Sequence, residues 1–153
     1  MFAELPLEPI EQAVVSGWIA WGAQNWEALR ELEATFAAVP REHPLAGQAE
    51  RLRAEWRVAS QVPALGAEAV VIIDRAHLIS NWPDQTLFRA QACVLAGYKL
   101  AALTSLSKIN PRFLADRKVS QQFSRLAREV LRKVPRDPEL EVLRNRIDRL
   151  LGE

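Results

Sequence analysis

The sequence predicts an all-α protein, and three observations carry this prediction. The 153 residues include 23 Ala and 20 Leu but only 3 Thr and 1 Tyr, which favours helices over strands. No segment alternates apolar and polar residues for long enough to indicate a half-buried strand. Apolar residues instead recur at intervals of three and four, and Pro, Gly, Asn and Asp divide the chain into about eight such segments.

Four helices are predicted in the first half of the chain. Asn25 is expected to cap the second of them, because its short side chain accepts a hydrogen bond from a backbone N–H at a helix start. The β-branched run at 70–73 is assigned to the fourth helix rather than to a strand, since Leu65, Ala69 and Ala76 surround it at helical spacing. The four helices span about 9–21, 25–39, 45–59 and 63–79.

Four more helices are predicted in the second half. Asp84 is expected to cap the fifth and Gly97 to end it, because Gly adopts the left-handed backbone that closes many helices. Asn110 and Asp137 are each followed by Pro, which is the pattern of a cap and a first helical residue. The four helices span about 85–97, 98–109, 111–134 and 138–151.

Short connections between these helices predict antiparallel hairpins, and small residues recur within them. Ala28, Ala69 and Ala102 each precede a larger residue by four positions and a further residue by seven. The pattern resembles the tetratricopeptide-repeat family, whose 34-residue unit is a helix–turn–helix. The second pair departs from it at Arg57, where the family has a small residue, and the third at Ile109 and Leu114. The best-matching pair carries Ser16, Ile19, Ala28, Leu32, Thr35 and Pro40.

The resemblance covers residues 9–110 and implies three degenerate helical hairpins stacked as a right-handed α-solenoid, within a single domain at 1–153. Residues 111–153 would form a C-terminal capping helix pair, because a solenoid needs a terminal unit with a polar outer face. They hold 11 Lys+Arg and 7 Asp+Glu, a net charge of +4, against −3 in residues 1–111. A closed helical bundle is the alternative.

Several classes of chemistry have no support in the sequence. The six Gly are scattered singly, so there is no phosphate-binding loop and no dinucleotide fingerprint. His43 and His77 lack the spacing of a metal-ligand pair. Cys93 lies in an apolar helical segment and is expected to be a buried, unreactive thiol. We therefore expect no catalytic residues, no metal and no cofactor.

Charge and hydropathy bear on the location of the protein. The net charge is +1, and the single Cys cannot form an internal disulfide. No apolar run approaches the roughly 20 residues that span a bilayer, and the first residues are acidic where a signal peptide is basic. A cytoplasmic protein that does not insert into a membrane is expected.

The leading functional hypothesis is a protein–protein interaction module that binds a peptide or partner helix in a groove, as an adaptor, assembly factor or chaperone. Chaperones of bacterial secretion systems include small helical domains of this kind. By the resemblance, the first helix of each pair lines the groove. In the third pair the groove residues would be Asp84, Leu87, Gln91 and Val94.

The five Trp residues divide between core and surface. Trp18 and Trp56 continue long apolar lines and are expected in the core. Trp21, Trp26 and Trp82 are candidate anchors for a partner, because Trp is enriched at the centres of interfaces.

Two other functions are weighed. A self-associating helical oligomer could form through the long seventh helix and the amphipathic last helix. Nucleic-acid binding is the third candidate, and interspersed acids make it less favoured. It would use a basic ridge at Arg125, Arg128, Arg132 and Arg136.

Overall fold

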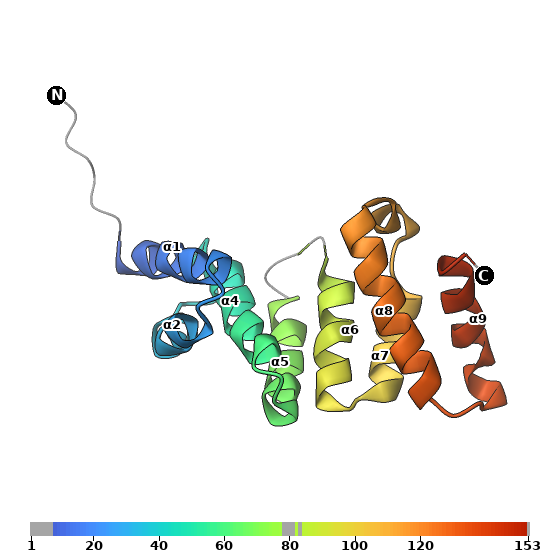
Figure 1. The fold of residues 1–153 in the computed structure, drawn as a ribbon. Coiled ribbons are helices and arrows are strands. Elements are labelled where there is room, and N and C mark those ends of the chain that lie inside the picture. The colour runs from blue at the N-terminus through green and yellow to red at the C-terminus, as the bar shows by residue number, and fades with distance from the viewer. Residues whose placement is uncertain (1–7, 78–81, 83, 153) are drawn as a thin grey trace. The chain divides into compact units, whose positions relative to one another are not determined.

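The computed structural model describes residues 8–77, 82 and 84–152, and every regular element within them is helical (Figure 1). The all-α prediction is therefore confirmed, and the run at 70–73 lies inside a helix. No helix among the described residues is long and apolar enough to cross a membrane. The elements are α1 (Pro9–Gly22), α2 (Trp26–Glu31), α3 (Glu33–Ala37), α4 (Ala46–Ala59), α5 (Pro63–Ala76), α6 (Gln85–Ala96), α7 (Lys99–Ser107), η1 (Pro111–Ala115), α8 (Arg117–Lys133), η2 (Pro138–Leu140) and α9 (Glu141–Leu150), where η marks a 3₁₀ helix.

The chain divides into two compact units. Unit 1 comprises residues 1–61 and 68–81, and unit 2 comprises residues 62–67 and 82–153. Unit 1 carries 6 Lys+Arg and 11 Asp+Glu, whereas unit 2 carries 14 and 8, so their net charges are −5 and +6. The single domain at 1–153, with repeats at 9–110 and a cap at 111–153, stays a prediction.

The core of unit 1 forms where α1, α2 and α3 contact α4. Leu29, Phe36 and Leu52 are fully buried there. Gly17 lets α1 approach closely, because a Cβ at this position would lie 2.7 Å from Leu52 Cδ1 and 2.8 Å from Phe36 Cζ. A small residue is therefore needed at this position of α1, because a larger side chain would collide with the closely packed core.

The helix predicted at 25–39 is wrong as a single element, because it divides into α2 and α3. Asn25 does cap α2, accepting a hydrogen bond from Ala28 N at 3.2 Å. The division falls at Leu32, whose N–H donates to the Leu29 carbonyl three residues back instead of four. Neither Gly nor Pro lies in this stretch. The physical reason is tertiary: α3 begins at Glu33, whose carboxylate is held by side chains of α4.

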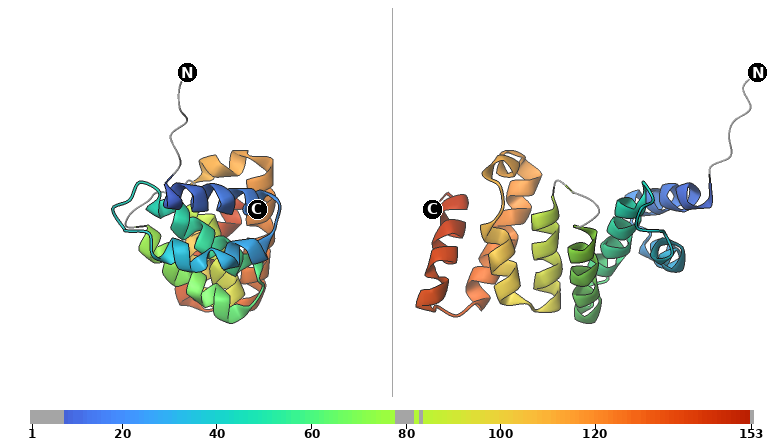
Figure 2. Two further views of the ribbon diagram at one scale, coloured as in Figure 1. Left: turned by 90° about the vertical axis from the view of Figure 1, so that its left-hand side faces the viewer. Right: turned by 180° about the vertical axis from the view of Figure 1, so that it is seen from behind.

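In unit 2 the helices α6, α7, α8 and α9 run antiparallel to one another in succession (Figures 1 and 2). Gly97 ends α6 in the left-handed conformation with φ at 82°, as expected. α7 contacts α6, α8 and α9, and α6 also contacts α8. Cys93 is fully buried in α6, as expected, whereas its low reactivity stays a prediction. The largest fully buried side chains of this unit are Leu103, Leu106, Phe123 and Ile147.

The seventh predicted helix begins later than the sequence suggests. Asn110 accepts a hydrogen bond from the backbone N–H two residues ahead, but it opens the short helix η1. α8 begins at Arg117, where the Asp116 carboxylate accepts hydrogen bonds from Lys118 N and Val119 N. Two cap signals therefore compete, and the second one starts the α-helix because it satisfies two backbone donors.

The other two expected caps also need correction. Asp137 accepts a hydrogen bond from Glu139 N, yet the residues after it form η2, and α9 begins at Glu141. Asp84 precedes α6 without a side-chain capping hydrogen bond. A cap residue followed by Pro marks a turn of 3₁₀ helix at both Asn110 and Asp137, because Pro fixes φ but does not decide between the two helix types.

Candidate functional site

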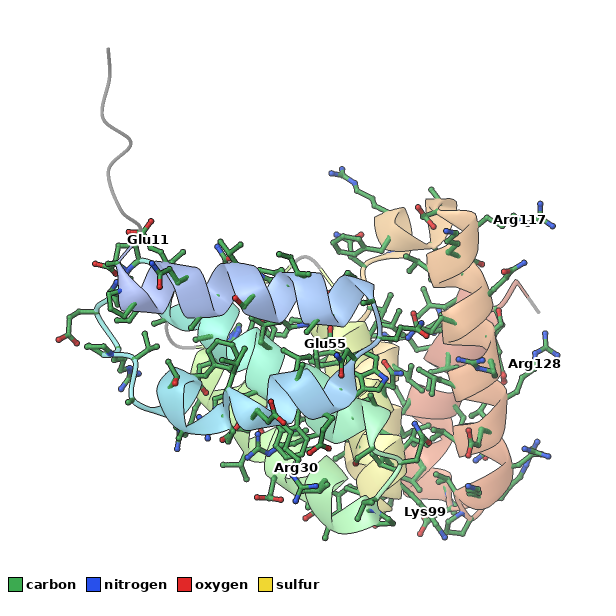
Figure 3. All side chains as sticks on the ribbon, turned by 60° about the vertical axis from the view of Figure 1, so that its left-hand side comes forward. Glu11, Arg30, Glu55, Lys99, Arg117 and Arg128 are labelled. Carbon is green, nitrogen blue, oxygen red and sulfur yellow. The ribbon has the colours of Figure 1, made fainter. Side chains whose placement is uncertain are left out.

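Three large apolar side chains of α1 face solvent. Ile19 is 68% exposed, Val15 is 47% exposed and Trp21 is 42% exposed. Glu11, at the first turn, is the single charged residue of this helix (Figure 3). The inner side is buried through Ala13, Val14, Gly17 and Ala20, whereas the outer side carries the polar residues Gln12 and Ser16 beside its apolar ones.

Trp18 joins the exposed residues into one surface. Its ring meets the Trp21 ring edge to face, with centroids 5.5 Å apart, and its Nε1 donates to Gln48 Oε1 at 2.9 Å. At 100° per residue, Ile19, Val15 and Trp18 fall within an arc of about 100°, and Trp21 lies about 60° beyond Trp18. We call these four residues the α1 apolar face. Trp21 was expected from the sequence to be an anchor, whereas Trp18, expected in the core, is half-buried.

The groove residues predicted on α6 lie in several environments. Asp84 is exposed, and Leu87 is buried. Gln91 accepts a hydrogen bond from Gln122 Nε2 of α8 at 3.1 Å, and Val94 lines a small cavity against α8. Leu87, Gln91 and Val94 therefore have neighbours within unit 2, and an open groove along α6 stays a prediction.

Two of these residues border an apolar pocket in unit 2. The pocket has a volume of about 110 Å³ and opens between the start of α6, the end of α7, η1 and the start of α8. Leu87, Ile109, Phe113 and Val119 supply apolar walls, while Asp84 and Lys108 carry opposite charges beside them. The pocket is smaller than the roughly 300–1,000 Å³ of a small-molecule site.

The remaining Trp candidates are packed to different degrees. Trp82 is half-buried, and its ring meets the Phe88 ring with centroids 6.3 Å apart. Trp26, the first residue of α2, is also half-buried, so neither residue is a freely exposed anchor. Trp56 is buried, as the sequence suggests.

A network of charged side chains links α3 to α4 in unit 1, and sequence analysis missed it. Glu33 Oε1 accepts hydrogen bonds from Arg57 Nη1 at 2.6 Å and Trp56 Nε1 at 3.3 Å. Glu33 Oε2 accepts from Arg57 Nη2 and Arg53 Nε, both at 2.9 Å. Arg57 is only 6% exposed and lies 4.4 Å from the centre of the Trp56 ring. Arg57, which departs from the repeat pattern, thus forms an ion pair with Glu33 that joins α4 to α3. We call this ion pair and its neighbouring bonds the ionic tether.

The network shifts two pKa values. Burial raises the pKa of Glu33, but hydrogen bonds and charges from Arg57 and Arg53 outweigh this effect and hold the pKa below its ordinary value. Burial lowers the pKa of Arg53, but Glu50 and Glu33 outweigh it and raise the pKa. Glu33 and Arg53 are therefore both charged at neutral pH.

A cavity of about 240 Å³ lies at the edge of this network in unit 1. Glu50, Arg41 and Arg75 contribute its charged groups, and alanines line much of the rest. Glu50 Oε1 accepts from Arg53 Nη1 at 3.0 Å, whereas its Oε2 is buried without a hydrogen bond and lies 3.9 Å from Arg75 Nη2. The cavity therefore presents charges of both signs.

His43 is a structural residue in this fold. Its Nδ1 accepts a hydrogen bond from Leu45 N at 3.0 Å, so the neutral ring carries its proton on Nε2, which faces Glu8 Oε1. Within residues 8–77, 82 and 84–152, no group of three or more His, Cys, Asp or Glu side chains is arranged to hold a metal ion.

Basic residues cover the outer side of α8. Arg125, Arg128 and Arg132 are exposed, as the sequence predicts for a ridge. Arg136 is not part of this helix, because α8 ends at Lys133. Sequence analysis missed the two residues that extend the ridge at the other end, Arg117 and Lys118. They lie eight and seven residues before Arg125, about two helical turns away. Together, Arg117, Lys118, Arg125, Arg128 and Arg132 are called the α8 basic stripe.

Comparison with protein-family models, with curated proteins and with solved structures finds no match to this chain.

Proposed function

We propose that the chain is a non-catalytic protein–protein interaction module, an adaptor, assembly factor or chaperone, that binds a helix or peptide of another protein. The α1 apolar face is the observation that carries this proposal, because it exposes Ile19, Val15 and Trp21 on one helix. Clusters of exposed apolar residues mark interaction sites, and Trp is prominent among residues that dominate binding. A partner helix with apolar residues every three or four positions would cover this face.

The tetratricopeptide-like stacking of hairpins is part of the same proposal. It is supported within unit 2, where α7 contacts α8 and α9 and α6 contacts α8. Contacts of this kind are expected when one helical hairpin stacks on the next. The pocket beside Leu87 and Phe113 offers a second place for one apolar side chain of a partner.

The test is capture of partners from the native cell, comparing the wild-type chain with Ile19→Gln. Burying an exposed Ile side chain contributes about 1.5–3 kcal/mol, and Ile19 is 68% exposed. We therefore expect its loss to weaken binding roughly tenfold. Val71→Gln is the matched control, because Val71 is 57% exposed on α5 and lies outside the α1 apolar face.

The outcome is read by quantitative mass spectrometry of the captured proteins and by light scattering of the purified chain. A stoichiometric partner that Ile19→Gln loses and Val71→Gln retains supports the proposal. Equal retention by both variants contradicts it. A discrete homo-oligomer that dissociates only in Ile19→Gln assigns the α1 apolar face to self-association instead.

A further inference from the structure

The α8 basic stripe concentrates positive charge on one side of one helix. At 100° per residue, its five members fall within an arc of about 100°. From Arg117 to Arg132 the stripe runs about 22 Å along the helix axis at 1.5 Å per residue. The opposite side of α8 is buried through Phe123, Leu126, Ala127 and Val130. Arg117 and Arg128 extend from the same side of the helix (Figure 3).

The described residues leave part of the α8 basic stripe without an acidic partner. Among the residues that the structure describes, Arg117, Arg125 and Arg132 form no ion pair. Glu129 lies beside the stripe, but its carboxylate accepts a hydrogen bond from Lys133 Nζ at 2.9 Å. Unit 2 as a whole has a net charge of +6.

The arrangement is also unfavourable for the helix itself. Arg117 and Lys118 occupy its first turn, where the helix dipole favours acidic side chains and disfavours basic ones. Arg125, Arg128 and Arg132 repel one another at spacings of three and four. Asp116 offsets the first effect through its cap. The helix dipole favours a basic residue in the last turn, which explains Arg132. Helix stability does not explain the other members of the α8 basic stripe.

We propose that the α8 basic stripe is a docking surface for an acidic helical segment of another protein. Such a segment would carry Asp or Glu every three or four residues, so its carboxylates would recur at the 4.5–6 Å intervals that separate Arg125, Arg128 and Arg132. An Arg side chain binds a carboxylate through two parallel hydrogen bonds. The charge complementarity therefore extends to the spacing as well as to the sign.

The observations favour an acidic protein over a nucleic acid. Binding to single strands uses exposed aromatic rings on which bases stack. Phe123, the aromatic residue of α8, is buried, and Phe113 of η1, which is 42% exposed, lines the apolar pocket. Guanidinium groups bind phosphates as well as carboxylates, so the sign of the charge does not distinguish the two partners. The spacing of Arg125, Arg128 and Arg132 does, because it equals the spacing of side chains along one side of a partner helix.

The experiment measures binding of a fluorescein-labelled peptide to the full-length chain by fluorescence anisotropy. The peptide has about 20 residues, enough to form a helix, with Glu every three or four positions among Ala residues. A second peptide has the same composition, with the Glu residues distributed all round the helix. Single-stranded RNA and duplex DNA of similar length are the nucleic-acid probes, and all are compared at the same salt concentration.

We expect the striped peptide to bind more tightly than the distributed peptide and than either nucleic acid. Arg125→Gln with Arg132→Gln should weaken this binding about tenfold, because two exposed ion pairs at up to about 1 kcal/mol each are lost. Arg30→Gln with Arg41→Gln is the matched control, since both residues are exposed in unit 1 and the charge change is the same. The control should stay within about twofold of the wild type.

Three results would overturn the inference. Tighter binding of RNA or DNA than of the striped peptide would assign the surface to nucleic acid. Equal losses in the stripe and control variants would show that net charge, rather than the α8 basic stripe, attracts the peptide. Equal binding of the striped and the distributed peptide would show that the spacing of the carboxylates does not determine binding. The inference does not depend on the α1 apolar face, so Ile19→Gln should leave peptide binding unchanged.

Discussion

Replacing Glu33 with Gln tests whether the ionic tether holds unit 1 together. The substitution keeps the shape of the side chain but turns one carboxylate oxygen into an NH₂ group. Each oxygen of Glu33 accepts two hydrogen bonds, so the new NH₂ would face two donors. Arg57, which is 6% exposed, would also lose its carboxylate partner.

The structure sets the expected size of the effect. Breaking one partner of a buried ion pair costs about 3–5 kcal/mol. The Glu33 side chain is 24% exposed and Arg53 keeps its bond to Glu50, which places the value at the lower end. We therefore expect unit 1 to lose about 3 kcal/mol of unfolding free energy at neutral pH. Glu27→Gln is the control, because Glu27 is exposed in the first turn of α2, and it should cost about 0.5 kcal/mol.

The assay is urea unfolding followed by Trp fluorescence, because four of the five Trp residues belong to unit 1. Circular dichroism follows both units and shows whether they unfold in one transition or two. The tether would be refuted by a loss below about 1 kcal/mol, or by a loss equal to that of Glu27→Gln.

The difference in unfolding free energy between the wild type and Glu33→Gln should depend on pH. The pKa of Glu33 is lower in the folded chain than its ordinary value of 4.5, so its stabilisation is complete above that value. The stabilisation is lost as the pH falls through the lower, folded-state pKa. The difference between wild type and Glu33→Gln should therefore be constant from pH 7 to about pH 5 and shrink below it. A difference that does not change down to pH 2 would contradict this account.

Two further substitutions test the packing of each unit. Gly17→Ala should destabilise unit 1 by about 1 kcal/mol, because overpacking against Leu52 at 2.7 Å costs about 1–3 kcal/mol and helix propensity returns about 1. Gly22→Ala has open space around its new Cβ and should not destabilise, so equal urea midpoints for the two variants would refute the reasoning. Arg144→Met should accelerate amide hydrogen exchange in α9, because Arg144 donates to two carbonyls at the end of α8 at 3.0 and 3.2 Å. Arg146→Met, at an exposed position, should leave exchange unchanged, and the same rate in both variants would argue against this anchor.

Sequence periodicity was enough to locate the helices but not all of their ends. Spacing of apolar residues and the cap at Asn25 depend on near neighbours, so they can be read from the chain itself. The division at Leu32 depends on bonds from α4 to Glu33, which lie at least 20 positions away in sequence. The start of α8 depends on competition between two caps, and spacing alone does not rank Asn110 against Asp116.

Site residues could be predicted from the sequence when their residue type favours interfaces. They could not be predicted when only their exposure in the fold makes them candidates. Trp21 and the Arg residues of α8 stand out in the sequence because their side chains favour interfaces. Ile19 does not stand out, because an Ile in a helix usually lies in the core. Its exposure follows from which side of α1 the other helices of unit 1 cover. Arg57 was visible as a departure from the repeat, but its partner Glu33 becomes apparent only when α3 and α4 come together.

The single thiol of the chain is a built-in reporter for unit 2. Cys93 is fully buried in α6, and the chain has no second cysteine that could compete for a reagent. A disulfide reagent such as Ellman's can reach this sulfur only when α6 opens, so the rate of colour development reports the opening equilibrium of that unit. The indole signal reports mainly on the other unit, since four Trp residues lie there. One unlabelled wild-type sample therefore yields separate stabilities for the two parts of the protein.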